Sequence, residues 1–105
     1  MESERMKVQI PFLARFKEPM LKGTKTMTSR TRKYGNAGDT FDAFGATFQI
    51  TEVGKMQLGN IAFLWKEEGM ESIFDFVKTW GQIHPQRFYD VDEWFYYHRF
   101  RKVKE

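Results

Sequence analysis

The stretch Gly23-Thr-Lys-Thr-Met-Thr-Ser-Arg30 predicts the central element of the fold. It opens on a glycine, which adopts the positive φ that ends a helix or closes a tight turn. After the glycine, the threonines and Arg30 alternate with Met27 and Ser29. This β-branched alternation is typical of a strand. We therefore expect a helix or turn to end at Gly23 and a strand to follow it.

The same stretch is rich in positive charge. Five cations and no acid lie between positions 22 and 33, and they are Lys22, Lys25, Arg30, Arg32 and Lys33. A strand that carries hydroxyls and cations is costly to bury, so one face should meet solvent or an anionic ligand. Positive surfaces favour phosphate-bearing partners. Because the net charge is only +3, scattered solubilising lysines remain an alternative.

Composition limits the classes of protein to consider. The 105 residues, of which 41% are hydrophobic and eleven are Phe, predict one domain over 1–105 whose core is filled largely by aromatic rings. The absence of Cys excludes disulfides, thiolate nucleophiles and cysteine metal sites. His84 and His98 are too few and too far apart to indicate a metal, and we expect a helix-end cap and a strand residue. No apolar run approaches the ~20 residues of a membrane span, so we expect a cytoplasmic protein without membrane contact or cofactor.

The order of predicted elements indicates an α+β fold. Hydrophobic periodicity and turn residues predict strands at 7–12, 26–30, 40–45, 46–53 and 94–101, and helices at 15–22, 60–68 and from Ser72 to before Pro85. The second helix is expected to begin at Asn60, and the third to have a capping box and to bury Trp80 in the core. Strands dominate, and no extended βαβ alternation occurs. We predict a small, mostly antiparallel, partly open β-barrel with about three short helices packed on it.

The pattern apolar-x-Gly-x-Lys-Thr-x-Thr-x-Arg, in Met20 to Arg30, followed by Gly38-Asp-Thr-Phe41, resembles the ASCH domain, a branch of the PUA-like barrels. Ile83-His-Pro85, Tyr89 and the aromatic final strand are also similar to small members, so the resemblance covers nearly the whole chain. It implies a PUA-like barrel that binds RNA or a nucleotide in a cleft beside this block. Some bacterial members are amidohydrolases that remove an acyl group from N4-acylated cytidine.

The resemblance also implies catalytic positions. In those hydrolases a Lys, a Thr and a Glu act, and they correspond to Lys25, Thr28 and Glu68, with Glu67 as the competitor for the acid. A desolvated lysine can activate a threonine hydroxyl, and a carboxylic acid can protonate the departing amine. Positions 25 and 28 point to opposite faces of a regular strand, so Lys25 must precede the strand or a bulge must intervene. Ser29 departs from the family pattern, which has an apolar residue there.

A binding role needs no catalysis. In this hypothesis a basic cleft holds RNA or a modified nucleoside or nucleotide, and tyrosines stack on its bases. Arg30 suits a phosphate fork, although an ion pair with Asp39 or Asp42 would also explain it. The expected binding residues are Lys25, Arg30, Arg32, Lys33, Tyr34 and Tyr89. We rank binding ahead of hydrolysis.

Overall fold

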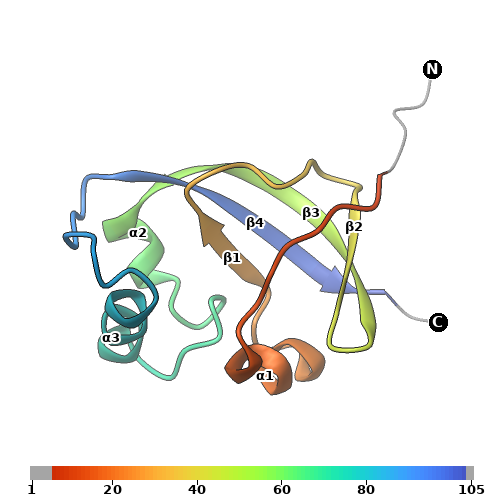
Figure 1. Cartoon of the computed structure of the whole chain (residues 1–105), viewed down its shortest axis with the longest axis horizontal. Helices are drawn as coiled ribbons and strands as arrows, with labels where there is room; N and C mark the ends of the chain where they lie inside the picture. The colour runs from red at the N-terminus through yellow and green to blue at the C-terminus, as the bar shows by residue number, and fades with distance from the viewer. Residues whose placement is uncertain (1–5, 104–105) are drawn as a thin grey trace.

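The computed structural model describes residues 6–103, and its strands form one antiparallel sheet (Figure 1). In spatial order they are β1 (Met27–Arg30), β4 (Trp94–Lys102), β3 (Ala46–Gln57) and β2 (Thr40–Ala43). β2 and β3 form the predicted hairpin, and the sheet curls into half a barrel (Figure 1). The predicted class, an α+β fold built on a partly open antiparallel barrel, is confirmed.

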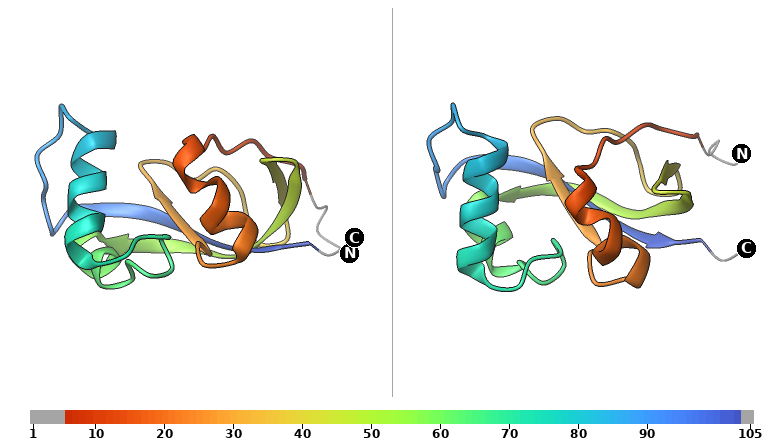
Figure 2. Two further views of the ribbon diagram at one scale, coloured as in Figure 1. Left: turned by 90° about the horizontal axis from the view of Figure 1, so that it is seen from below. Right: turned by 60° about the horizontal axis from the view of Figure 1, so that its bottom comes forward.

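Three α-helices accompany the sheet within the described residues: α1 (Lys17–Lys22), α2 (Leu58–Phe63) and α3 (Ile73–Ile83). A 3-10 turn (Ala14–Phe16) leads into α1, and Gly23 ends it with φ of 85°. Figure 2 shows α1 and α3 standing apart, with β1 running between them. Gly23 therefore does what the sequence predicts, because it stops the helix and turns the chain into β1.

The predicted cap of α3 forms in part. The backbone N–H of Asp75 donates to Ser72 Oγ at 3.0 Å, which satisfies one of the free donors at a helix start. The Asp75 carboxylate accepts from the backbone N–H of Glu71 at 3.0 Å, one residue before the position that a capping box requires. Trp80 is buried as expected, and Thr79 beside it is also buried, whereas Val77 is exposed.

Two predicted elements differ from the structure. Residues 7–12 form no strand, and only Lys7 makes an isolated parallel bridge, to Thr40. Pro11 has no N–H to offer a ladder, and its carbonyl accepts from Arg30 instead. The helix expected over 60–68 begins at Leu58 and ends at Phe63, so Asn60 is not its N-cap.

The segment after α2 leaves the helix because it pairs with the chain before β1. The Glu67 carbonyl accepts from the N–H groups of Thr26 and Met27 at 2.7 and 2.9 Å. Lys25 and Glu68 form an isolated antiparallel bridge. These tertiary bonds outweigh the weak helical preference of the segment.

The core is aromatic, as the composition predicts. Phe41 stacks on Phe48 at a centroid distance of 5.4 Å, and Phe100 meets both rings edge-on. Trp80 and Phe95 make a second edge-to-face contact at 4.8 Å. Full burial of such rings contributes about 1.5–3 kcal/mol each. Among residues 6–103, no helix is long and apolar enough to cross a membrane.

His98 joins three parts of the fold at the back of β1. It lies on β4 opposite Thr28, and none of its surface is exposed. Its Nε2 accepts from the backbone N–H of Tyr34 at 3.0 Å, so its Nδ1 carries the proton and faces the Thr28 carbonyl at 3.3 Å. The imidazole is therefore neutral, and burial lowers its pKa below the usual value.

This burial makes stability depend on pH. The unfolded chain takes up a proton on His98 near the ordinary pKa, and the folded chain does so only at a lower pH. The folded state should therefore be fully stable above about pH 6.5 and should lose at most about 1.4 kcal/mol per pH unit as the pH falls toward the lowered pKa. Chemical denaturation at several pH values measures this slope. His98→Gln should flatten the slope far more than His84→Gln, and equal slopes in both variants would contradict this account.

Candidate functional site

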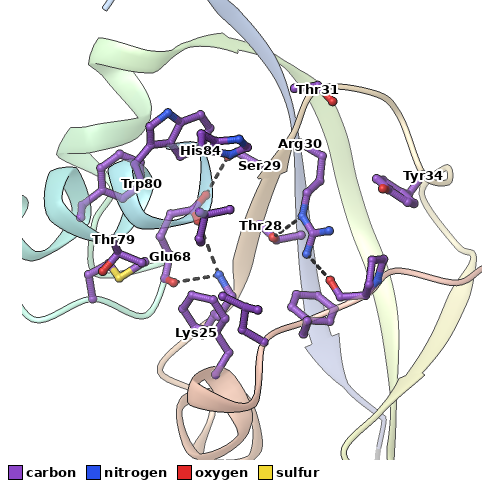
Figure 3. Close-up of a pocket in the computed structure, with 17 residues that line it drawn as sticks. Lys25, Thr28, Ser29, Arg30, Thr31, Tyr34, Glu68, Thr79, Trp80 and His84 are labelled. Carbon is purple, nitrogen blue, oxygen red and sulfur yellow. Dashed lines mark hydrogen bonds and ion pairs between the residues drawn. The ribbon is translucent and has the colours of Figure 1, made fainter. Parts of the chain in front are cut away.

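A cavity of about 360 Å³ opens beside β1, toward α3 (Figure 3). One wall is polar and comes from the β1 segment and the chain after α2. The apolar wall consists of side chains from the N-terminal segment, near Arg30, and of side chains from α3 on another side of the cavity. The lining includes Phe12, Phe16, Lys25, Thr28, Ser29, Arg30, Tyr34, Glu68, Trp80 and His84.

Lys25 is buried in the floor of this cavity, with 2% of its surface exposed. Its Nζ donates to the carbonyls of Met27 and Glu68, both at 2.8 Å, and lies 3.5 Å from Glu68 Oε1. The ammonium also sits 4.5 Å from the centre of the Phe16 ring. Its three protons thus have three acceptors, which favours the charged form.

Burial acts on Lys25 in the opposite direction. Desolvation lowers the pKa of its amine, Glu68 opposes that change, and Arg30 reinforces it. The resting arrangement is an ammonium with all its donors engaged. Compared with a solvated lysine, however, this group gives up a proton at a lower cost.

Lys25 lies before the first residue of β1, Met27, as a site shared with Thr28 requires, and both residues line the cavity. Their polar atoms have different partners, because Lys25 Nζ contacts Glu68 Oε1 and Thr28 Oγ1 accepts from Arg30 Nε. Gly69 permits the close approach on the other side: its φ is 88°, and a Cβ there would lie 2.7 Å from the Cβ of Lys25. A larger residue would displace the lysine.

Glu68 is the carboxylate that faces the cavity. Its Oε2 accepts from Ser29 Oγ at 2.7 Å, and 5% of its surface is exposed. Glu67, the competing candidate, points elsewhere and accepts from Arg99 Nε at 2.9 Å. The backbone of the pair is fixed against β1, so the alternation of side chains sends one carboxylate inward and the other outward.

Arg30 and Tyr34 stand on the side of the cavity away from α3 (Figure 3). Arg30 Nε donates to Thr28 Oγ1 at 3.1 Å, and its Nη2 donates to the Pro11 carbonyl at 2.6 Å. Its Cζ lies 4.9 Å from the ring centre of Phe12 and 5.5 Å from that of Tyr34. The guanidinium is held by neutral groups and aromatic faces.

Arg30 does not pair with Asp39 or Asp42, the two acids considered as its partners. Asp39 accepts from the backbone N–H groups of Met6 and Asn36, and Asp42 pairs with Lys7. Among residues 6–103, Arg30 therefore has no acid within ion-pair distance.

The remaining expected site residues lie outside this cavity. Arg32 places its Cζ 4.5 Å from the Tyr34 ring centre and lines a neighbouring hollow. Lys33 is exposed and lines neither space. Tyr89 is half-buried and lines a separate hollow near α2 with Phe63 and Val91. The structure thus brings together Lys25, Thr28, Glu68, Arg30 and Tyr34, and leaves the others apart.

Sequence reasoning missed three lining residues. Trp80 was expected only as core, yet its ring forms part of the apolar wall. His84 contacts it at a centroid distance of 4.4 Å with the two rings tilted by 41°, and burial lowers the pKa of this imidazole. Trp80 and His84 are four residues apart, and this spacing of one helical turn was the signal in the sequence that their side chains would meet. Ser29 was noticed only as a departure from a pattern. Residues 6–103 contain no cluster of three His, Asp or Glu residues placed to hold a metal.

Solved structures share this architecture, although no protein-family model and no curated protein matches the sequence. An ASCH domain from Lactobacillus crispatus has a TM-score of 0.64 and 14% identity, over 93% of this chain and 79% of that one. A mutant of ZmASCH from Zymomonas mobilis has a TM-score of 0.67 and 12% identity, over 95% and 74%. A DUF984 protein from Enterococcus faecalis V583 has a TM-score of 0.66 and 15% identity, over 98% and 78%. At these identities the likeness concerns the fold, and the chain has the fold of an ASCH domain.

Proposed function

We propose that this chain binds RNA or a nucleotide and that the cavity beside β1 receives one base. The observation that carries this proposal is that polar groups and aromatic rings line one cavity of about 360 Å³. The polar wall has buried acceptors and hydroxyls, and the apolar wall has aromatic rings. A flat ring with hydrogen-bonding edges is the ligand shape that such a space suits.

The polar wall is suited to the edge of a base. Glu68 has a buried carboxylate, and Ser29 and Thr28 have hydroxyls that both donate and accept. These groups are already held by hydrogen bonds to Lys25 and Arg30. A preorganised edge loses little freedom on binding, which favours affinity.

Arg30 and the aromatic wall supply the rest of the interaction. Arg30 uses two N–H groups on Thr28 and Pro11, so further donors of the guanidinium are available to a phosphate or a carbonyl. Stacking of a base on an aromatic ring contributes about 1–3 kcal/mol, and Trp80 is the largest ring in the wall.

The fluorescence of Trp80 reports on this proposal directly. Binding of short single-stranded RNA should quench it, and the quenching should be absent in Trp80→Phe, because Trp65 and Trp94 do not line the cavity.

Arg30→Ala should weaken RNA binding about tenfold or more and reduce its salt dependence. The matched control is Arg101→Ala, an exposed arginine outside the cavity. Quenching that persists without Trp80, or equal losses in the two arginine variants, would contradict the proposal.

A second function is favoured by the convergence of Lys25, Thr28 and Glu68 on one cavity. In this proposal the chain removes the acyl group of an N4-acylated cytidine. Thr28 Oγ attacks the acyl carbonyl and gives its proton to the Lys25 amine. The C–N bond then breaks, Glu68 as the carboxylic acid protonates the departing amine, and water releases the acyl group from Thr28.

The resting contacts set a condition on this chemistry. Lys25 must release one proton before it can act as the base, and Glu68 must hold one. Since burial lowers the pKa of Lys25, transfer of a proton from the ammonium to the carboxylate produces both forms at once. The 3.5 Å between the two groups allows this exchange.

Turnover of N4-acetylcytidine, followed by chromatography, tests the second function. Thr28→Val and Lys25→Met should each lower the rate about 100-fold or more, and Thr28→Ser should retain part of it. Because the active pair holds the same number of protons as the resting pair, the rate should not rise with pH, and it should fall as the pH passes the lowered pKa of Lys25, which lies below the usual 10.5. Since Lys25→Met also removes a buried contact, circular dichroism should first establish that it folds. No turnover by the wild-type protein would exclude this function and leave base binding intact.

A further inference from the structure

A second hollow adjoins the cavity and shares part of its lining. It encloses about 660 Å³ and is lined in part by Lys7, Arg32 and Asp42. Pro11 and Tyr34 line both spaces, so these two residues form the partition between them.

Two guanidinium groups meet at the partition. Arg30 and Arg32 place their Cζ atoms 5.5 and 4.5 Å from the centre of the Tyr34 ring. A hydrogen bond from Arg32, with the charges of both arginines, lowers the pKa of the Tyr34 hydroxyl. The partition between the two spaces is therefore a region of positive potential.

The charges inside the second hollow do not cancel. Lys7 is neutralised by Asp42, which also accepts from Thr47 Oγ1 at 2.8 Å. Arg32 is exposed and forms no ion pair within residues 6–103. An anion in this hollow would meet one unneutralised guanidinium beside an aromatic ring.

We propose that the second hollow is a phosphate and sugar subsite, so that the ligand of this chain is a phosphodiester-linked or phosphorylated nucleotide rather than a free nucleoside. This inference rests on the proposed binding of a base in the first cavity. The base enters beside β1, the phosphate lies at the partition against Arg32, and the following nucleoside occupies the open hollow.

The arrangement also assigns different roles to the arginines. Arg30 donates hydrogen bonds to Thr28 Oγ1 and to the Pro11 carbonyl, so its removal changes the shape of the base site as well as its charge. Arg32 lies outside the first cavity and forms no ion pair within residues 6–103, so it would act on the phosphate alone. Contacts to phosphate position a nucleic acid, and contacts to base edges specify it.

Calorimetric titration of the intact protein separates these roles. The probes are the four common ribonucleosides, their 5′- and 3′-monophosphates, the corresponding dinucleotides, and inorganic phosphate. At least one phosphorylated form should bind about tenfold or more tightly than its nucleoside. Arg32→Gln should lower the ratio of nucleotide affinity to nucleoside affinity to about one. Arg101→Gln, which removes an equally exposed arginine outside both spaces, should keep the gain.

Three results would overturn the inference. Equal affinity for nucleosides, nucleotides and dinucleotides would refute it while base binding survives. Inorganic phosphate that binds as tightly as the nucleotide would identify an independent anion site. If none of the probes binds, the proposed function fails and this inference fails with it.

Discussion

The contact between Lys25 and Glu68 is the interaction on which the site depends. A lysine with 2% of its surface exposed is held by two carbonyls and a carboxylate, and one of those carbonyls belongs to Glu68 itself. The same bridge fixes the chain after α2 against the start of β1. Loss of one partner alone would leave an uncompensated buried charge, which costs several kcal/mol, about 3–5 in typical cases.

This constraint explains the shape of the polar wall. The chain after α2 follows β1 closely, so Glu68 reaches Ser29 while Glu67 turns outward to Arg99. Gly69 completes the turn without a side chain that would collide with the lysine. The wall is therefore assembled from two segments that are distant in sequence, and each polar group in it has a partner before any ligand arrives. Such a preorganised wall would lose little conformational freedom if a ligand bound to it.

The elements that follow local rules were predictable, and those set by tertiary bonds were not. Gly23 and the strand that follows it are local signals and lie where the sequence predicts them, and the cap at Ser72, also a local signal, forms in part. The stretch 60–68 has helical composition, but its end is determined by hydrogen bonds to Thr26 and Met27. Similarly, the place of Tyr89 depends on how the late loop folds over α2. A ring on a buried helix face also looks the same in sequence whether it meets other side chains or an open space, and Trp80 was assigned to the core for that reason.

His98 gives the site a built-in sensitivity to its surroundings. The backbone N–H of Tyr34 donates to the unprotonated Nε2 of this imidazole. A proton on Nε2 would break this hydrogen bond, and Tyr34 is the residue that divides the two hollows. An occupant that required Tyr34 in this position would favour the neutral His98 imidazole and lower its proton affinity. By thermodynamic reciprocity, protonation of the ring weakens the hold on that occupant to the same degree. A lower pH would thus weaken binding of the occupant, although the proton is bound outside the cavity.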